Sequence, residues 1–72
     1  MSEKWEIEDA YLKIVIAGFH REQAMTADDV VGAGFANNSD DALAAMTLVV
    51  ERDIGFWVEV DGVQAVEVPG DE

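Results

Sequence analysis

Apolar residues recur along the chain at two different spacings, and the change of spacing separates helices from strands. Between residues 7 and 18 they recur every three or four residues, which predicts an amphipathic helix. The same spacing returns over residues 39–53 and predicts a second long helix. Over residues 56–68, two runs rich in β-branched and aromatic residues flank Asp61-Gly62, which predicts strand, tight turn and strand.

The helix predicted over residues 39–53 organises the chain around it, because the hairpin follows it directly. Ser39 is a favourable N-cap, and Asp40 and Asp41 place negative charge in the first turn, where the exposed N–H groups favour it. The apolar residues of this helix form one broad stripe that is expected to face a core. They are Ala42, Leu43, Met46, Val49 and Val50.

The first helix, predicted to begin at Ile7 and to end near Arg21, carries two apolar stripes, so it needs cover on more than one side. The first stripe consists of Ile7, Ala10, Tyr11, Ile14, Val15 and Gly18. The second stripe, Leu12, Ile16 and Phe19, exceeds what one small domain can cover, and exposed apolar patches mark interfaces. We therefore expect a homodimer whose interface contains Leu12, Ile16 and Phe19.

A shorter helix is predicted between the two long ones. Thr26 is its expected N-cap, Asp29 stands where a carboxylate can bond back to the cap, and Gly32 with Gly34 ends the helix. Residues 35–38 then form a turn whose asparagines tolerate left-handed geometry. Two capped helices separated by such a turn match a helix-turn-helix.

The predicted hairpin has two competing registers. A two-residue type I′ turn at Asp61-Gly62 pairs Phe56 with Glu67. The apolar pattern instead prefers Phe56 opposite Val68, a register shifted by one residue, and a bulge would reconcile the two. The sequence leaves the register open.

The order of elements from Asp9 to Val68 resembles winged helix-turn-helix domains of the kind common in archaeal transcriptional regulators. The expected fold class is α+β, a winged helix-turn-helix with three helices followed by a two-stranded β-hairpin wing. Residues 1–72 are expected to form a single winged-helix-like domain with an ordered core over about 7–68, and residues 1–6 to be loose or a short strand. The resemblance implies that the third helix enters the DNA major groove and that the wing touches the DNA backbone or minor groove.

Charge is the strongest compositional signal. Sixteen acidic residues stand against four basic ones, and the formal net charge is -12. This composition resembles proteins of extreme halophiles, in whose molar salt the screening length falls to about 3 Å and self-repulsion largely disappears. The alternative interpretations are an ordinary acidic protein and a DNA mimic. Half of the residues are apolar, which argues against a wholly disordered acidic chain.

The residues expected to face DNA carry no positive charge. The candidate DNA contacts are Asn37, Asn38, Ser39, Thr47 and Gln64. Lysine and arginine normally supply DNA affinity by displacing counterions from phosphates, so a halophilic DNA binder must rely on direct contacts, such as asparagine with adenine. The alternative is that both asparagines only shape the turn.

Two functions follow from these observations. The first is a small, acidic, halophilic winged-helix protein that binds DNA as a transcriptional regulator. The alternative is a non-enzymatic winged-helix module for protein–protein interaction, or a DNA mimic. The expected partner is accordingly DNA or a protein, besides a second copy of the chain.

No motif predicts an enzyme, a cofactor or a metal site. His20 is the only histidine and cysteine is absent, so no metal-ligand spacing occurs. The acidic pairs at residues 8–9, 28–29 and 40–41 lie in predicted first turns, where capping explains them. No apolar run approaches the roughly 18 residues of a membrane span, and the first residues lack signal-peptide order. We therefore expect a cytoplasmic protein that binds no membrane.

Overall fold

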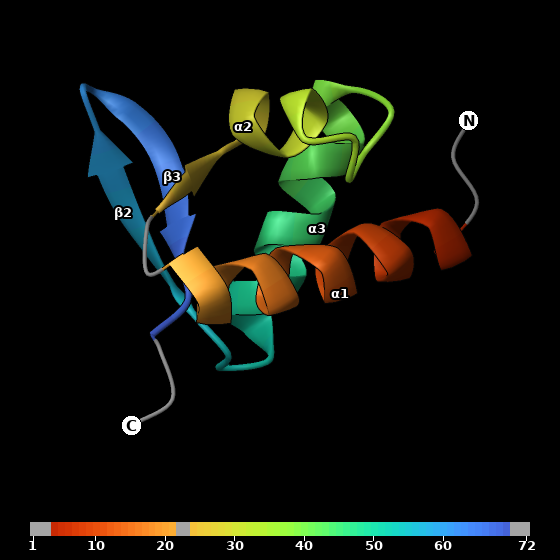
Figure 1. Ribbon diagram of the computed structural model, residues 1–72, viewed down its shortest axis with the longest axis horizontal. Helices are drawn as coiled ribbons and strands as arrows, with labels where there is room; N and C mark the ends of the chain where they lie inside the picture. The colour runs from red at the N-terminus through yellow and green to blue at the C-terminus, as the bar shows by residue number, and fades with distance from the viewer. Residues whose placement is uncertain (1–3, 22–23, 70–72) are drawn as a thin grey trace.

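The computed structural model describes residues 4–21 and 24–69, apart from the side chains of residues 19–21. The elements are α1 (Lys4–Arg21), β1 (Met25–Thr26), α2 (Ala27–Gly32), α3 (Ser39–Glu51), β2 (Phe56–Val60) and β3 (Val63–Glu67). The strands form one antiparallel sheet in the order β1-β3-β2 beside the helices (Figure 1). The predicted α+β class is confirmed, and the arrangement is compatible with a winged-helix layout.

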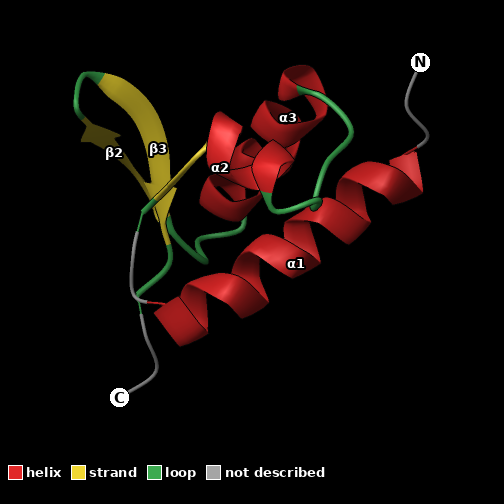
Figure 2. Cartoon of the chain, turned by 45° about the horizontal axis from the view of Figure 1, so that its top comes forward, coloured by secondary structure: helices red, strands yellow, loops and turns green. Residues whose placement is uncertain are grey.

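The core lies where the helices meet the sheet, with α1 and α2 both packed against α3 (Figure 2). The largest wholly buried side chains come from every layer and are Ile14, Met46, Val30, Val49 and Val66. The first stripe predicted for α1 supplies Ala10, Tyr11 and Ile14 to this core. Leu43 departs from its prediction: it is 39% exposed, because it lies at the edge of the apolar stripe of α3.

α1 begins at Lys4, three residues before the predicted start of the helix. Residues 4–6 are therefore helical, and their predicted loose or strand conformation is wrong. Glu6 lies in the first turn, where a carboxylate complements the helix dipole. The prediction began the helix at the first core residue, Ile7, but a helix can continue beyond its buried part. The expectations for residues 1–3 and 70–72 lie outside the described residues.

The caps of α2 and α3 both form, one of them a residue away from its predicted place. Thr26 Oγ1 accepts a hydrogen bond from the Asp29 N–H (3.2 Å), and Asp29 Oδ2 accepts one from the Thr26 N–H (3.1 Å), as predicted. The N-cap of α3 is Asn38 rather than Ser39, because Asn38 Oδ1 accepts a hydrogen bond from the Asp41 N–H at 2.9 Å. Asparagine and serine are about equally good caps, so residue preference did not distinguish them.

The hairpin adopts the register that its turn dictates. Asp61 and Gly62 have φ values of 51° and 80°, and a type I′ turn requires positive φ at both positions. Phe56 pairs with Glu67, and the pairing continues without interruption to the turn. The register with Phe56 opposite Val68 therefore does not form, and no bulge interrupts these two strands.

A third strand, β1, completes the sheet and was not predicted from the sequence. Met25 and Thr26 pair with Val66 and Ala65 of β3. Two residues are too few to show an alternating pattern, so the strand becomes recognisable only once β3 is placed beside it. It anchors the start of α2 to the sheet.

α3 ends at Glu51, two residues before the predicted end. The chain then makes a turn that passes close to β3. Asp53 has a φ of 61°, a left-handed conformation that stops the helix. A Cβ added at Gly55 would lie 2.5 Å from the Glu67 carbonyl oxygen and 2.8 Å from Val49 Cγ1. The close approach of this turn to β3 therefore depends on the missing side chain of Gly55.

Gly55→Ala is expected to lower the free energy of unfolding by about 1–3 kcal/mol, the usual cost of forcing extra volume into a packed site. Gly32→Ala is the matched control. Nothing lies within 4 Å of a Cβ at Gly32, at the end of α2, so alanine there gains up to about 1 kcal/mol of helix propensity. Urea unfolding in molar KCl measures both, and loss of stability in both variants would contradict the steric explanation.

Candidate functional site

The turn before α3 and the exposed side of α3 contain four of the five predicted DNA contacts. Two of these four side chains already serve the helix itself. Asn38 Oδ1 is the N-cap acceptor, and the Thr47 hydroxyl donates a hydrogen bond to the Leu43 carbonyl oxygen at 2.8 Å. Asn37 and Ser39 are exposed. The fifth predicted contact, Gln64, is exposed on β3, in the hairpin.

The exposed side of α3 and the hairpin carry negative charge and apolar surface. Asp40, Leu43 and Glu51 are exposed on α3, and Glu59 and Asp61 are exposed on the hairpin. Arg52 is the only basic residue after Arg21 in the whole sequence. A phosphate backbone laid along these elements would therefore meet carboxylates instead of the cations that normally hold it.

Arg52 is engaged with α1. Its guanidinium donates two hydrogen bonds to the Glu8 carboxylate, from Nη1 to Oε2 at 3.0 Å and from Nη2 to Oε1 at 2.5 Å. The guanidinium carbon also lies 4.6 Å from the centre of the Tyr11 ring, a cation–π arrangement. The hydrogen bonds from Arg52 lower the pKa of Glu8, with smaller contributions from the charges of Arg52 and Lys4. This contact fastens the end of α3 to α1.

Arg52→Gln is expected to raise the pKa of Glu8 back toward its ordinary value. Because the pKa of Glu8 is lowered in the folded protein, its contribution to stability is present above the unfolded pKa and is lost as the pH falls through the folded pKa. The carboxyl ¹³C shift of Glu8, followed against pH, measures the change. Lys13→Gln is the control, because Lys13 pairs with Asp9 instead. An unchanged Glu8 titration in Arg52→Gln would contradict the assignment.

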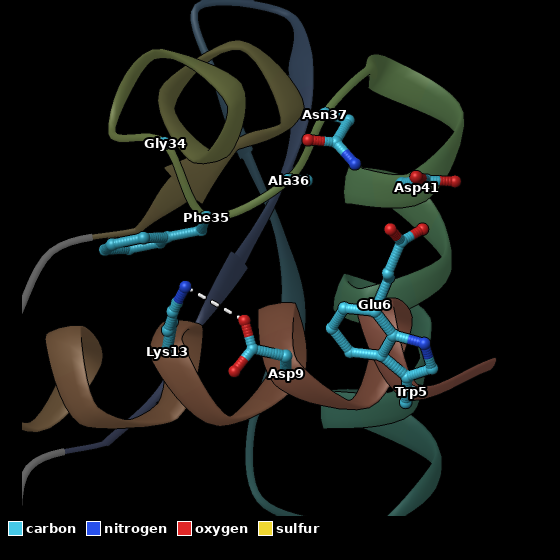
Figure 3. Close-up of a pocket in the computed structure, with 9 residues that line it drawn as sticks. All are labelled: Trp5, Glu6, Asp9, Lys13, Gly34, Phe35, Ala36, Asn37 and Asp41. Carbon is cyan, nitrogen blue, oxygen red and sulfur yellow. Dashed lines mark ion pairs between the residues drawn. The ribbon is translucent and has the colours of Figure 1, made fainter. Parts of the chain in front are cut away.

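A hollow of about 180 Å³ lies between the first half of α1 and the turn before α3 (Figure 3). We call it the α1–turn pocket; it is lined by Trp5, Glu6, Asp9, Lys13, Gly34, Phe35, Ala36, Asn37 and Asp41. Trp5 and Phe35 lie at its two ends, and Lys13 Nζ pairs with Asp9 Oδ2 at 2.9 Å between them. Two aromatic rings with three carboxylates suit a planar or cationic side chain.

The pocket was not foreseen, because it joins α1 to a turn more than twenty residues away. Of the residues named as DNA contacts, it contains Asn37 alone. Trp5, which also lines it, is 66% exposed. The spacing of seven residues between Trp5 and Leu12 is the sequence signal that would have placed them on one side of a helix.

Two further apolar surfaces are exposed. The first, which we call the α1 stripe, consists of Trp5, Leu12 and Ile16. The second, the hairpin patch, consists of Phe56, Val60 and Val63. These three lie on the outer side of the sheet, because strand residues alternate and Trp57 with Val66 faces the core.

The side chains of Phe19, a predicted dimer residue, and of His20 lie outside the described part of the chain.

Within residues 4–21 and 24–69, no group of three or more His, Asp or Glu side chains is placed to hold a metal ion. Over the same residues, none of the helices combines the length and apolar character that crossing a membrane requires. No family model, curated protein or solved structure matches the chain.

Proposed function

We propose that the chain is a non-enzymatic interaction module of winged-helix type that binds a partner protein. The α1–turn pocket supports this proposal best, because it combines the rings of Trp5 and Phe35 with carboxylates beside an exposed turn. A lysine or arginine side chain of the partner would enter the pocket on the Trp5 side of the Lys13–Asp9 pair, where cation–π contact with the indole and the charge of Glu6 favour it.

The charge around the pocket supports a basic protein as the partner. Glu6, Asp9 and Asp41 line the pocket, and Asp40 is exposed next to it at the start of α3. Lys13 is the one cation in the lining, and its charge is offset by Asp9. A basic surface would meet complementary charge here, whereas DNA would meet like charge.

Binding of N-acetylarginine amide, measured by NMR at the lowest KCl concentration that keeps the protein folded, tests the proposal. The two tryptophans provide an internal control, because Trp5 lines the pocket while Trp57 packs against the core. The indole N–H signal of Trp5 is expected to shift and that of Trp57 to stay. N-acetylcitrulline amide, which has nearly the same shape without the charge, should shift neither.

Glu6→Gln provides the second arm of this test. Glu6 lies in the first turn of α1 and lines the pocket, so its neutral variant should bind the arginine probe more weakly without unfolding. Equal shifts with the arginine and citrulline probes, or equal shifts at both tryptophans, would reject the pocket as a cation-binding site.

A DNA-binding transcriptional regulator of halophilic type is the second candidate. The observation that favours it is the layout, in which α2, a turn and α3 are followed by a hairpin, with Asn37 and Ser39 exposed at the start of α3. Without arginine to contact guanine, the remaining hydrogen-bonding side chains favour A·T-rich sequence.

Fluorescence anisotropy with labelled A·T-rich and G·C-rich duplexes in molar KCl tests this second candidate. Asn37→Ala is expected to reduce preference for the A·T-rich duplex while stability is unchanged. Asn38→Ala is the comparison, because it removes the N-cap and should cost about 1 kcal/mol of stability. If the folded protein binds neither duplex, the DNA-binding candidate is rejected and the protein-binding proposal is the one that stands.

A further inference from the structure

The α1 stripe lies on the side of α1 opposite the core. Trp5, Leu12 and Ile16 are 66%, 54% and 57% exposed, while Ala10 and Ile14 of the same helix are wholly buried. The spacings of seven and four residues bring the three exposed side chains into line along the helix. α1 is therefore apolar on two sides, and the residues that the structure describes cover only one of them.

The basic residues of the protein are concentrated on the same helix. α1 contains Lys4, Lys13 and Arg21, three of the four basic residues, but only three of the sixteen acidic residues. Asp9 is paired with Lys13 of the same helix, and Glu8 with Arg52. The thirteen other acidic residues lie elsewhere in the sequence. The surface around the α1 stripe thus escapes the strong negative charge of the rest.

This distribution selects a second copy of the chain as the partner for the α1 stripe. Where the acidic surfaces of two copies with a net charge of -12 meet, like charges would be buried against each other, and salt screens buried charges much less than exposed ones. The hairpin patch is also apolar, but Glu67 pairs with Phe56 on the same side of the sheet and the exposed Asp61 lies at the turn beside Val60, so two copies meeting there would bring like charges together. Contact through α1 is the arrangement that buries apolar area with the least repulsion.

We infer that the protein forms a two-fold homodimer in which the α1 stripe of one copy packs against the α1 stripe of the other. In such an isologous contact the same residues serve both copies. A helix of 18 residues is about 27 Å long. One pair of helices buries less than the standard area of about 800 Å² per partner. The dimer is accordingly expected to dissociate in the micromolar range. It shares Trp5 with the α1–turn pocket, but it forms or fails to form whatever the pocket binds.

Light scattering coupled to size exclusion in molar KCl, from micromolar to millimolar protein, tests the dimer. The wild-type mass is expected to rise to twice the 7.8 kDa of the chain. Ile16→Glu should raise Kd about 100-fold or more, because a charge would be buried in the interface of each copy, and it should therefore remain monomeric at the micromolar concentrations at which the wild type dimerises. Neither Leu12 nor Ile16 lines the α1–turn pocket, so these variants keep its lining intact, and arginine binding can be measured on the monomeric variant, in which no second copy covers Trp5.

Val63→Glu is the matched control. Val63 is 51% exposed on the hairpin patch, and its substitution adds the same charge as Ile16→Glu. It should dimerise like the wild type. Leu12→Ser is the substitute if circular dichroism shows that Ile16→Glu does not fold. A wild-type protein that is monomeric at millimolar concentration would overturn the inference, and so would a dimer broken by Val63→Glu but not by the α1 variants.

Discussion

In dilute buffer at neutral pH the protein is expected to be largely unfolded, and to fold as the KCl concentration rises toward molar. Acidic side chains are exposed on every helix and on the hairpin, including Asp9, Asp28, Asp40, Glu51 and Glu59. Raising the salt from about 0.1 M to 1 M shortens the screening length from about 10 Å to 3 Å. Because a small domain is stable by only about 0.05–0.15 kcal/mol per residue, we expect that screening the repulsion among these carboxylates decides whether the protein folds.

Far-UV circular dichroism during a KCl titration measures this transition. Asp28→Lys combined with Glu59→Lys is the control for charge itself. Both residues are exposed, and the two substitutions together change the net charge from -12 to about -8. The control should fold at a lower KCl concentration than the wild type. Thermal midpoints that are equal in dilute and in molar salt would contradict the electrostatic explanation.

The features that the sequence predicted are those decided by neighbouring residues. The capping box of Thr26 and Asp29 formed because both partners lie within one turn of the same helix. The Asp61-Gly62 turn set the hairpin register, since its backbone conformation imposes the pairing on either side. Where the turn and the apolar pattern predicted different registers, the strands pair in the register of the turn, and Phe56 is exposed as a consequence.

The features that escaped prediction depend on residues distant in the sequence. β1 exists only because Met25 and Thr26 meet β3. The Arg52–Glu8 contact joins residues 44 positions apart. The α1–turn pocket likewise needs α1 and the turn before α3 to be placed side by side. No local sequence pattern shows that these residues, which are distant in the sequence, come together in space, so the candidate site was less predictable than the fold.

Ile14→Ala is expected to remove about 2–5 kcal/mol of stability, a loss that takes a domain of this size close to complete unfolding. Ile14 is wholly buried in the core formed by α1, α3 and the sheet. Truncation there loses the contacts of the removed atoms and leaves a cavity that the surrounding helices cannot fully close. Urea unfolding in molar KCl, at micromolar protein or below, measures the free energy of the monomer.

Ile16→Ala is the matched control, since it makes the same chemical change two residues away on the same helix. Ile16 is 57% exposed, so its truncation should change the stability of the monomer by no more than about 0.5 kcal/mol. The gain in helix propensity is the same for both variants, and their difference therefore reports burial alone. At millimolar protein the losses of stability in the two variants should become more similar, because Ile16→Ala then also loses the stabilisation that dimerisation gives the folded state. Equal losses at low concentration would mean that Ile16 is buried within the monomer, and the α1 stripe would no longer be an exposed surface.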